Sequence, residues 1–451
     1  ELGGFSARKI ARIEAAAAEE GHDLADGFTD DVPDPEPDYT NEELVSLNMA
    51  LAESYGALEQ WRLGVEPYHF VIENTSDEDR KGYAILQLVN ALIALEEFDE
   101  ARTFILQLYR TNARYNIRVN MALMKTAAAL FNVDELDSAL MLYRMVLPRA
   151  DLVSHQARKM NEIRLNVGLP TVTVSIVANE SGRLETIFGY THAELDIKNS
   201  GGESNLGQPS KPVELIELEE AVERLVSLPP YENEVLYRTG LLYARVDRPW
   251  EAVRALDLTA ARDPDGELGQ RALAESLLIL VDPLHKYGRV ETRSRNFLET
   301  HIEGLGPRMV AHALTISYQK QILWKEVKNL LPVIEGFVFS DQPSVLQYEC
   351  ELYYMQAIAD MVLLNYKEAK SGFERVLTDF PDSHQQESSS YWHAMAQVFL
   401  KNHQEALEEL DAYSQTYPEG NWLPSASFHC GICLFGLENF DGAQARFTQV
   451  I

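Results

Sequence analysis

Small side chains recur along this chain at a nearly fixed interval, and apolar side chains surround each of them at the spacing of a helix. We call these mostly small residues the markers; they are Gly64, Ala101, Ala139, Ala252, Val327, Ala369, Ala406 and Ala443. The interval is 37 or 38 residues in the N-terminal group and 37 residues in the C-terminal group. Each marker has a ring-bearing or aliphatic side chain three residues before it and an apolar one four residues after it. The pattern predicts a repeated helical unit.

A second residue, usually small, lies twelve positions before each marker. These residues are Ala52, Val89, Ala127, Gly240, Thr315, Ala357, Ala394 and Gly431. They predict a pair of antiparallel helices in each unit, whose backbones approach closely at the small residues while larger side chains form an apolar stripe. One pair cannot cover its own stripe, so successive pairs should stack into a superhelix. Between Ala252 and Val327 there is room for one irregular unit, around Arg289 to His301.

With a small residue, an aromatic residue, an alanine and a closing proline at these relative positions, the sequence resembles the tetratricopeptide repeat family. The resemblance covers about two thirds of the chain. It implies an all-α superhelix, or α-solenoid, in which the first helix of each pair lines a concave surface. The unit endings Asp379–Ser383 and Thr416–Gly420 look like those of bacterial cell-envelope members, such as outer-membrane-assembly lipoproteins and Tol-Pal coordinators.

The stretch from Leu165 to Pro212 does not follow the helical pattern. Residues Thr171–Val177 are β-branched and partly alternating, Gly182 marks a turn, and Glu185–Ile197 supplies a candidate return strand. We interpret this stretch as a small β hairpin, with an ordered long loop over a repeat edge as the alternative.

These patterns divide the chain into four predicted segments. Residues 1–40 hold an alanine-rich helix, about Ala7 to Glu20, and an acidic proline-rich linker. We interpret the linker as a spacer; the alternatives are a mask for a basic partner and a tether that joins the helix to another protein. The other segments are N-terminal repeats at 41–164, the insertion at 165–212 and C-terminal repeats at 213–451. Because the last unit ends at Ile451 without a polar capping helix, we expect the repeats to continue beyond it.

Charge and composition narrow the kinds of partner. The chain has 451 residues, with 39 lysines and arginines against 70 aspartates and glutamates, which gives a net charge of −31. This charge argues against nucleic acid or an anionic membrane as the main partner. The sequence contains no run of about twenty apolar residues, so it predicts no transmembrane helix. We expect partner proteins with basic or apolar segments, and a homo-oligomer is compatible with the same surface.

No sequence pattern indicates an enzyme, a cofactor site or a metal site. The Gly304-Leu305-Gly306 stretch lacks the third glycine of a dinucleotide site. Cys430 and Cys433 have the Cys-x-x-Cys spacing, but the repeat phasing places them inside a helix, away from the N-terminus that would activate a thiol. A structural zinc site needs four ligands, and no second such pair occurs. We therefore predict a non-catalytic protein that binds neither cofactor nor metal.

The side chains predicted to line the concave surface are unusually apolar. They are Tyr237, Leu241, Tyr354, Ile358, Met361, Tyr391, Met395, Phe399, Phe428, Ile432 and Phe435. An apolar stripe with an acidic rim is suited to bind a partner segment and to select basic flanks. The alternative is that tight curvature buries these side chains against adjacent repeats.

The leading hypothesis is a non-catalytic scaffold that assembles other proteins, as a subunit of a larger complex. The resemblance of the unit endings favours a periplasmic or cell-envelope location, although the sequence does not determine the compartment. The alternatives are a cytoplasmic regulatory adaptor or peptide-binding receptor, and the non-catalytic part of a larger enzyme.

Overall fold

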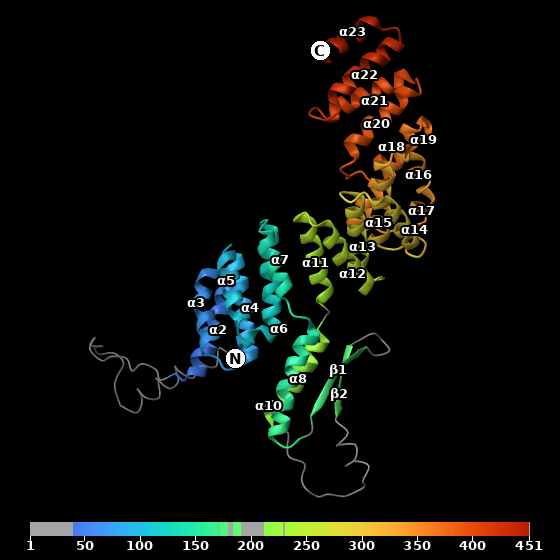
Figure 1. Ribbon diagram of the computed structural model, residues 1–451. Helices are drawn as coiled ribbons and strands as arrows, with labels where there is room; N and C mark the ends of the chain where they lie inside the picture. The colour runs from blue at the N-terminus through green and yellow to red at the C-terminus, as the bar shows by residue number, and fades with distance from the viewer. Residues whose placement is uncertain (1–38, 170, 179–183, 191–211, 229–230, 451) are drawn as a thin grey trace, which may run out of the picture.

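Stacked antiparallel helix pairs make up most of the molecule (Figure 1), as the repeat pattern predicts. The computed structural model describes residues 39–169, 171–178, 184–190, 212–228 and 231–450. The predicted helix at Ala7–Glu20 and nearly all of the acidic linker lie outside these residues. Within them, the fold is an all-α solenoid with one small β hairpin, which confirms the predicted fold class.

Three helix pairs form the N-terminal part of the array. They are α2 (Asn41–Ala57) with α3 (Trp61–Asn74), α4 (Glu78–Ala94) with α5 (Phe98–Tyr109), and α6 (Ile117–Asn132) with α7 (Leu136–Met145). Polar side chains cap several helix N-termini: the Thr40 side chain accepts from the backbone of Glu43, whose carboxylate accepts from the Thr40 N–H in return. A single-turn helix, η1 (Asn112–Tyr115), precedes α6.

The C-terminal part continues the same architecture. Its pairs are α11 (Glu232–Arg245) with α12 (Pro249–Arg262), α13 (Glu267–Val281) with α14 (Tyr287–Leu298), α15 (Leu305–Lys320) with the short helices α16 (Trp324–Lys328) and α17 (Leu331–Glu335), α18 (Pro343–Val362) with α19 (Tyr366–Asp379), α20 (Gln386–Phe399) with α21 (His403–Thr416), and α22 (Leu423–Gly436) with α23 (Phe440–Val450). The irregular unit expected near Arg289–His301 is the α13–α14 pair, and the buried Val290 takes the place of its marker.

Every marker side chain is buried, and the small residues lie where paired helices cross. A Cβ atom added at Gly240 in α11 would come within 2.7 Å of Leu256 in α12. One added at Gly431 in α22 would come within 2.5 Å of the Phe447 ring in α23. The recurring small residues therefore exist because the two backbones of a pair approach too closely for larger side chains.

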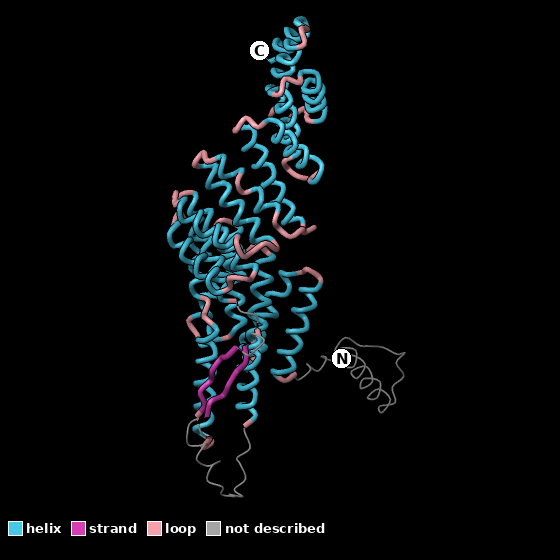
Figure 2. Tube along the Cα trace, turned by 90° about the vertical axis from the view of Figure 1, so that its right-hand side faces the viewer, coloured by secondary structure: helices cyan, strands magenta, loops and turns pink. Residues whose placement is uncertain are grey.

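A branch leaves the array between α7 and α11. It consists of α8 (Arg149–Asn166), the antiparallel strands β1 (Val172–Ala178) and β2 (Leu184–Tyr190), and α10 (Val213–Ser227). The hairpin is therefore present, paired from Val172 with Tyr190 to Ala178 with Leu184. Figure 2 shows the strands beside the helices of the branch. The branch has its own apolar core, which includes Leu152, Met160, Val172, Leu215 and Val222.

The base of the branch is closed by hydrogen bonds. The Tyr231 hydroxyl donates to the Leu147 carbonyl at 2.7 Å, and the buried Arg149 donates to the Val226 carbonyl at 3.0 Å. Helix α7 packs directly on α11, where Arg144 donates to the Tyr243 hydroxyl at 2.6 Å. The array thus runs from α7 to α11 without the branch. Helices α8 and α10 pack together from either side of the predicted 165–212 segment, and the domain boundaries stay a prediction.

Candidate partner-binding surfaces

The predicted lining residues fall into three groups by exposure. Tyr237, Met361, Tyr391 and Met395 are buried; Leu241, Tyr354, Ile358 and Ile432 are half-buried; Phe399, Phe428 and Phe435 are 46 %, 43 % and 60 % exposed. The prediction of a continuous exposed stripe is therefore wrong at the four buried positions. These side chains are part of the core between successive pairs.

The next helix pair explains this burial. Tyr391 in α20 stacks on Trp422 at a ring distance of 4.9 Å, and its hydroxyl lies 2.7 Å from the Ser425 Oγ of α22. Burial raises the pKa of the Tyr391 hydroxyl. Thirty-seven residues further on, Phe428 occupies the equivalent position in α22, and no described helix covers it. Equivalent positions of the repeat are therefore buried in one helix pair and exposed in the next.

Among the described residues, the exposed side chains of the last two helices, α22 and α23, include several aromatic ones. Phe428 lies 5.6 Å from Phe447, and Phe435 contacts Phe440 edge-on at 5.3 Å, so side chains of α22 and α23 form one surface. Phe440 is 57 % exposed. Aromatic side chains of this kind are enriched at protein–protein interfaces.

A second surface lies along the turns that join the two helices of each pair. In the described part of the chain, the non-glycine residues with positive φ all lie five positions before a marker or before Val290. They are Glu59, Glu96, Asp134, Asp247, His285, Ile322, Leu364, Lys401 and Glu438. Each turn closes the first helix with a left-handed residue, as helix C-termini commonly do. Charged or polar side chains suit this exposed position, yet Ile322 and Leu364 are aliphatic.

Sequence reasoning missed Ile322 and Leu364 as surface features. Their side chains are 76 % and 68 % exposed, more than any of the predicted lining residues. An alignment of the residues five positions before each marker would have found them, since that column is otherwise charged apart from His285.

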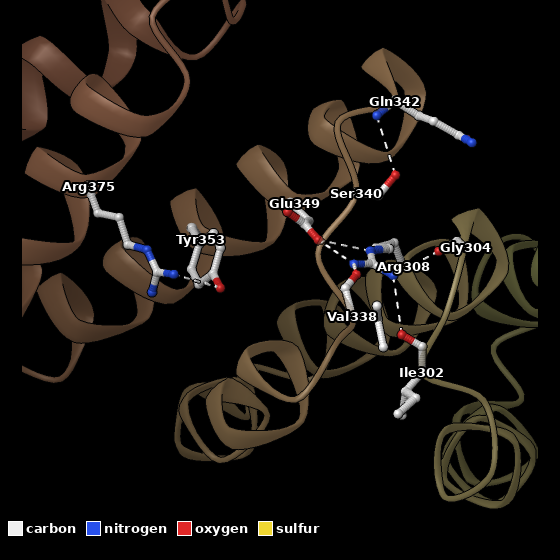
Figure 3. Close-up of polar contacts among 9 residues, drawn as sticks. All are labelled: Ile302, Gly304, Arg308, Val338, Ser340, Gln342, Glu349, Tyr353 and Arg375. Atoms are coloured by element: carbon white, nitrogen blue, oxygen red, sulfur yellow. Dashed lines mark hydrogen bonds and ion pairs between the residues drawn. The ribbon is translucent and has the colours of Figure 1, made fainter.

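A buried arginine joins α15 to α18 (Figure 3). Arg308 in α15 is fully buried and donates to the Glu349 carboxylate of α18 at 2.5 and 3.0 Å. It also donates to the carbonyl oxygens of Val338 at 2.6 Å and Gly304 at 2.9 Å. Arg308 therefore holds the longer loop between α17 and α18, where the marker interval widens to 42 residues, from Val327 to Ala369.

The two cysteines of α22 are placed for packing. Cys430 and Cys433 are fully buried in the middle of the helix, and burial raises their thiol pKa values to about 12 and about 11. Thiols with such pKa values are protonated, and therefore weak nucleophiles, near neutral pH. No group of three or more metal-ligating His, Cys, Asp or Glu side chains occurs among the described residues.

Comparison with known proteins agrees with the helix pairing. Residues 351–383 match the family model for the tetratricopeptide repeat. This chain carries a tetratricopeptide repeat. The matched stretch takes in most of α18 and all of α19, and it ends just before α20. The predicted resemblance to the tetratricopeptide repeat family is therefore confirmed. No curated protein matches the sequence.

Several solved structures match the chain at low identity. A tetratricopeptide repeat protein from Parabacteroides merdae is 15 % identical, with a TM-score of 0.34, and the match covers 48 % of this chain and 78 % of that one. The apo form of RapI is 13 % identical, with a TM-score of 0.42 and coverage of 90 % and 96 %. A putative kinesin light chain with TPR-like repeats from Podosopora anserina is 15 % identical, with a TM-score of 0.30 and coverage of 49 % and 95 %.

The repeat architecture is that of a protein-interaction scaffold or adaptor. Among the described residues, none of the helices combines the length and the apolar composition needed to cross a bilayer.

Proposed function

We propose that this protein is a non-catalytic scaffold that binds partner proteins through the aromatic surface of α20 and α22. The observation that carries the proposal is that Phe399, Phe428 and Phe435 are between 43 % and 60 % exposed among the described residues. Clusters of exposed aromatic side chains are rare on surfaces that contact only water and are typical binding anchors.

The chain segment that carries most of this aromatic surface is acidic, which favours a partner of opposite charge. Residues 403–441 contain seven aspartates and glutamates and no lysine or arginine. Among them, Glu438 and Asp441 flank the exposed Phe440 and have no ion-pair partner among the described residues. A partner segment with apolar anchors and basic flanks would therefore meet a complementary surface, and its association should weaken as salt screens the charges.

The scaffold fits a subunit of a larger assembly, because a solenoid presents several surfaces along one rigid array. The unit endings that resemble those of bacterial envelope proteins make an envelope assembly the first to examine. The proposal assigns no reaction to this chain.

The test compares proteins that co-purify with the chain from its native source, quantified by mass spectrometry. The double variant Phe428→Ser/Phe435→Ser should lose specific partners at least about tenfold, the effect of removing one or two central anchors. Phe339→Ser is the matched control, because Phe339 is 83 % exposed but lies in the loop before α18. Undiminished recovery with the double variant, or an equal loss with the control, would contradict the proposal.

A further inference from the structure

Two turns in the C-terminal part carry exposed aliphatic side chains on backbone that disfavours them. Ile322 has a φ of 61° and Leu364 a φ of 64°. The left-handed conformation is unusual for any L-residue and especially so for a β-branched one such as isoleucine. Neither side chain belongs to a core cluster of the described residues. The fold gains nothing from them that Asn or Gly would not supply, so we look for their role outside the fold.

Contacts between neighbouring pairs show that the turns form one continuous edge. Lys320, beside the α15–α16 turn, pairs with Asp282 of the α13–α14 turn at 3.0 Å. The Gln356 side chain of α18 donates to the Val327 carbonyl of α16 at 2.6 Å. Tyr366, just after the α18–α19 turn, stacks on Phe399 at 4.9 Å. The turns therefore follow one another along the array.

The exposed apolar side chains on this edge form what we call the turn ridge: Ile322, Leu323, Val362, Leu364 and Phe399, each between 41 % and 76 % exposed. Three successive turns contribute to it, so an extended or helical segment lying along the edge would contact all of them.

The turns of the ridge are less acidic than the chain as a whole: the segments 320–326, 362–368 and 399–405 hold net charges of +1, 0 and 0. Lys325, Lys367 and Lys401 are exposed, one at each turn, and make no ion pair within the described residues. The equivalent seven-residue turn segments 94–100 and 132–138 hold charges of −4 and −3 and no lysine or arginine. The lysines thus mark the ridge as a local exception in a chain of net charge −31.

We infer that the turn ridge is a binding site for an acidic amphipathic segment of a partner protein. Its apolar anchors would cover Ile322, Leu364 and Phe399, and its carboxylates would pair with the three free lysines. A bilayer is the other surface that takes aliphatic and lysine side chains together. The net charge of the chain would repel an anionic membrane, so we assign the ridge to a protein segment.

This site is distinct from the aromatic surface of the proposed function, which selects basic flanks. The two surfaces share Phe399. A partner of the turn ridge would be acidic, whereas a partner of the aromatic surface would be basic.

The test is selection of a random peptide library displayed on phage, using the purified full chain. Peptides retained by the chain are eluted, sequenced and compared with those retained by the double variant Ile322→Asn/Leu364→Asn. Asparagine tolerates the left-handed backbone, so this variant should fold and melt at the same or a higher temperature. The enriched wild-type peptides should combine acidic with apolar residues, and the variant should bind them about tenfold more weakly.

Two further measurements complete the test. The charge-reversal variant Lys325→Glu/Lys367→Glu should bind the same peptides more weakly. Its binding of peptides selected by the aromatic surface of α20 and α22 should be unchanged. Asp134→Asn is the matched control, because it alters an equivalent turn outside the ridge. Flotation with vesicles of phosphatidylserine and phosphatidylcholine measures lipid binding directly.

Three outcomes would overturn the inference. The first is that the folded double variant retains the peptides with wild-type affinity. The second is that the peptides lost in the double variant are basic. The third is that the chain floats with anionic vesicles and the double variant does not, which would assign the ridge to lipid. Loss of co-purifying partners in Phe428→Ser/Phe435→Ser bears on the other surface only, so the two proposals fail separately.

Discussion

The N-terminal and C-terminal pairs share one turn geometry but present different side chains on it. The turns of α4–α5 and α6–α7 place Glu96 and Asp134 in the left-handed position, whereas those of α15–α16 and α18–α19 place Ile322 and Leu364 there. The turn backbone is the same and the marker is buried in each of these pairs, so the stacking of pairs does not decide this difference. The comparison teaches that the repeat determines the helix packing and the turn backbone, whereas the side chains exposed on the turns can vary.

Removing Arg308 should affect the molecule most and should separate the two regions. In Arg308→Ala, the Glu349 carboxylate and the Gly304 and Val338 carbonyls lose their buried donor. Breaking a buried pair from one side lowers the free energy of unfolding by about 3–5 kcal/mol. Chemical denaturation measures the loss. Arg62→Ala, which breaks an exposed pair with Glu97 among the N-terminal helices, should leave the free energy of unfolding nearly unchanged.

Overpacking the seams should affect both regions alike. Ala101→Leu between α4 and α5 and Ala406→Leu between α20 and α21 each enlarge a fully buried marker. Each should lower the free energy of unfolding by about 1–3 kcal/mol, because the close approach of the helices leaves no room. Ala412→Leu, on the exposed face of α21, should be nearly neutral. A neutral result at either marker would show that the two regions are not built on the same seam.

Exchanging turn residues should test the comparison at the position where it arises. Ile322→Asn should raise the free energy of unfolding by about 1 kcal/mol, since it relieves a β-branched residue in the left-handed region. Asp134→Ile, the reverse change in the N-terminal region, should lower it by a similar amount. Thermal unfolding monitored by circular dichroism measures both. Equal effects of the same sign would mean that the turns differ in backbone energy as well as in side chain.

Histidine–carboxylate pairs also distinguish the N-terminal from the C-terminal region. Of the changes considered, removing one of these pairs should affect the free energy of unfolding least. Among the described residues, these pairs all lie between residues 265 and 409. Glu351 in α18 lies 3.0 Å from His312 and 3.3 Å from His384, and the hydrogen bond from His312 is the main cause that lowers the pKa of Glu351.

Because that pKa lies below its ordinary value of 4.5, the unfolded chain takes up the proton first as pH falls. The contribution of Glu351 to stability is therefore complete above pH 4.5 and is lost as pH falls through the folded-state pKa. Unfolding curves between pH 7 and pH 3 should show a slightly shallower decline in Glu351→Gln than in wild type. The exposed control Glu419→Gln should follow the wild-type curve, and an identical curve for Glu351→Gln would refute the linkage.

The repeat interval predicted the fold because it reports a local requirement, the close crossing of two helices. The positions of Ala369 and Ala406 in their helix pairs could be predicted from the sequence alone. The hairpin could also be predicted, because its β-branched run departs from the helical pattern. The α13–α14 pair was harder to place, because its marker is the larger Val290 and its turn residue is His285.

Exposure was less predictable than position. Tyr391 and Phe428 occupy the same place in their pairs, and only the presence of Trp422 on one of them decides which is buried. Sequence phasing gives the direction of a side chain and not how far the next pair covers it. The turn ridge was missed for a different reason: the sequence shows Ile322 and Leu364 as the aliphatic residues of their column, but only the structure shows that φ is positive there.

The closed base of the branch has a consequence for how this molecule can change. The hydrogen bond between Tyr231 and Leu147 joins the chain segment that enters the branch to the segment that leaves it, and α7 contacts α11 directly. Segments spliced in at such a point can lengthen, shorten or be replaced without disturbing the pitch on either side. The branch is thus a position where another domain could be inserted while the helix pairs on either side keep their alignment.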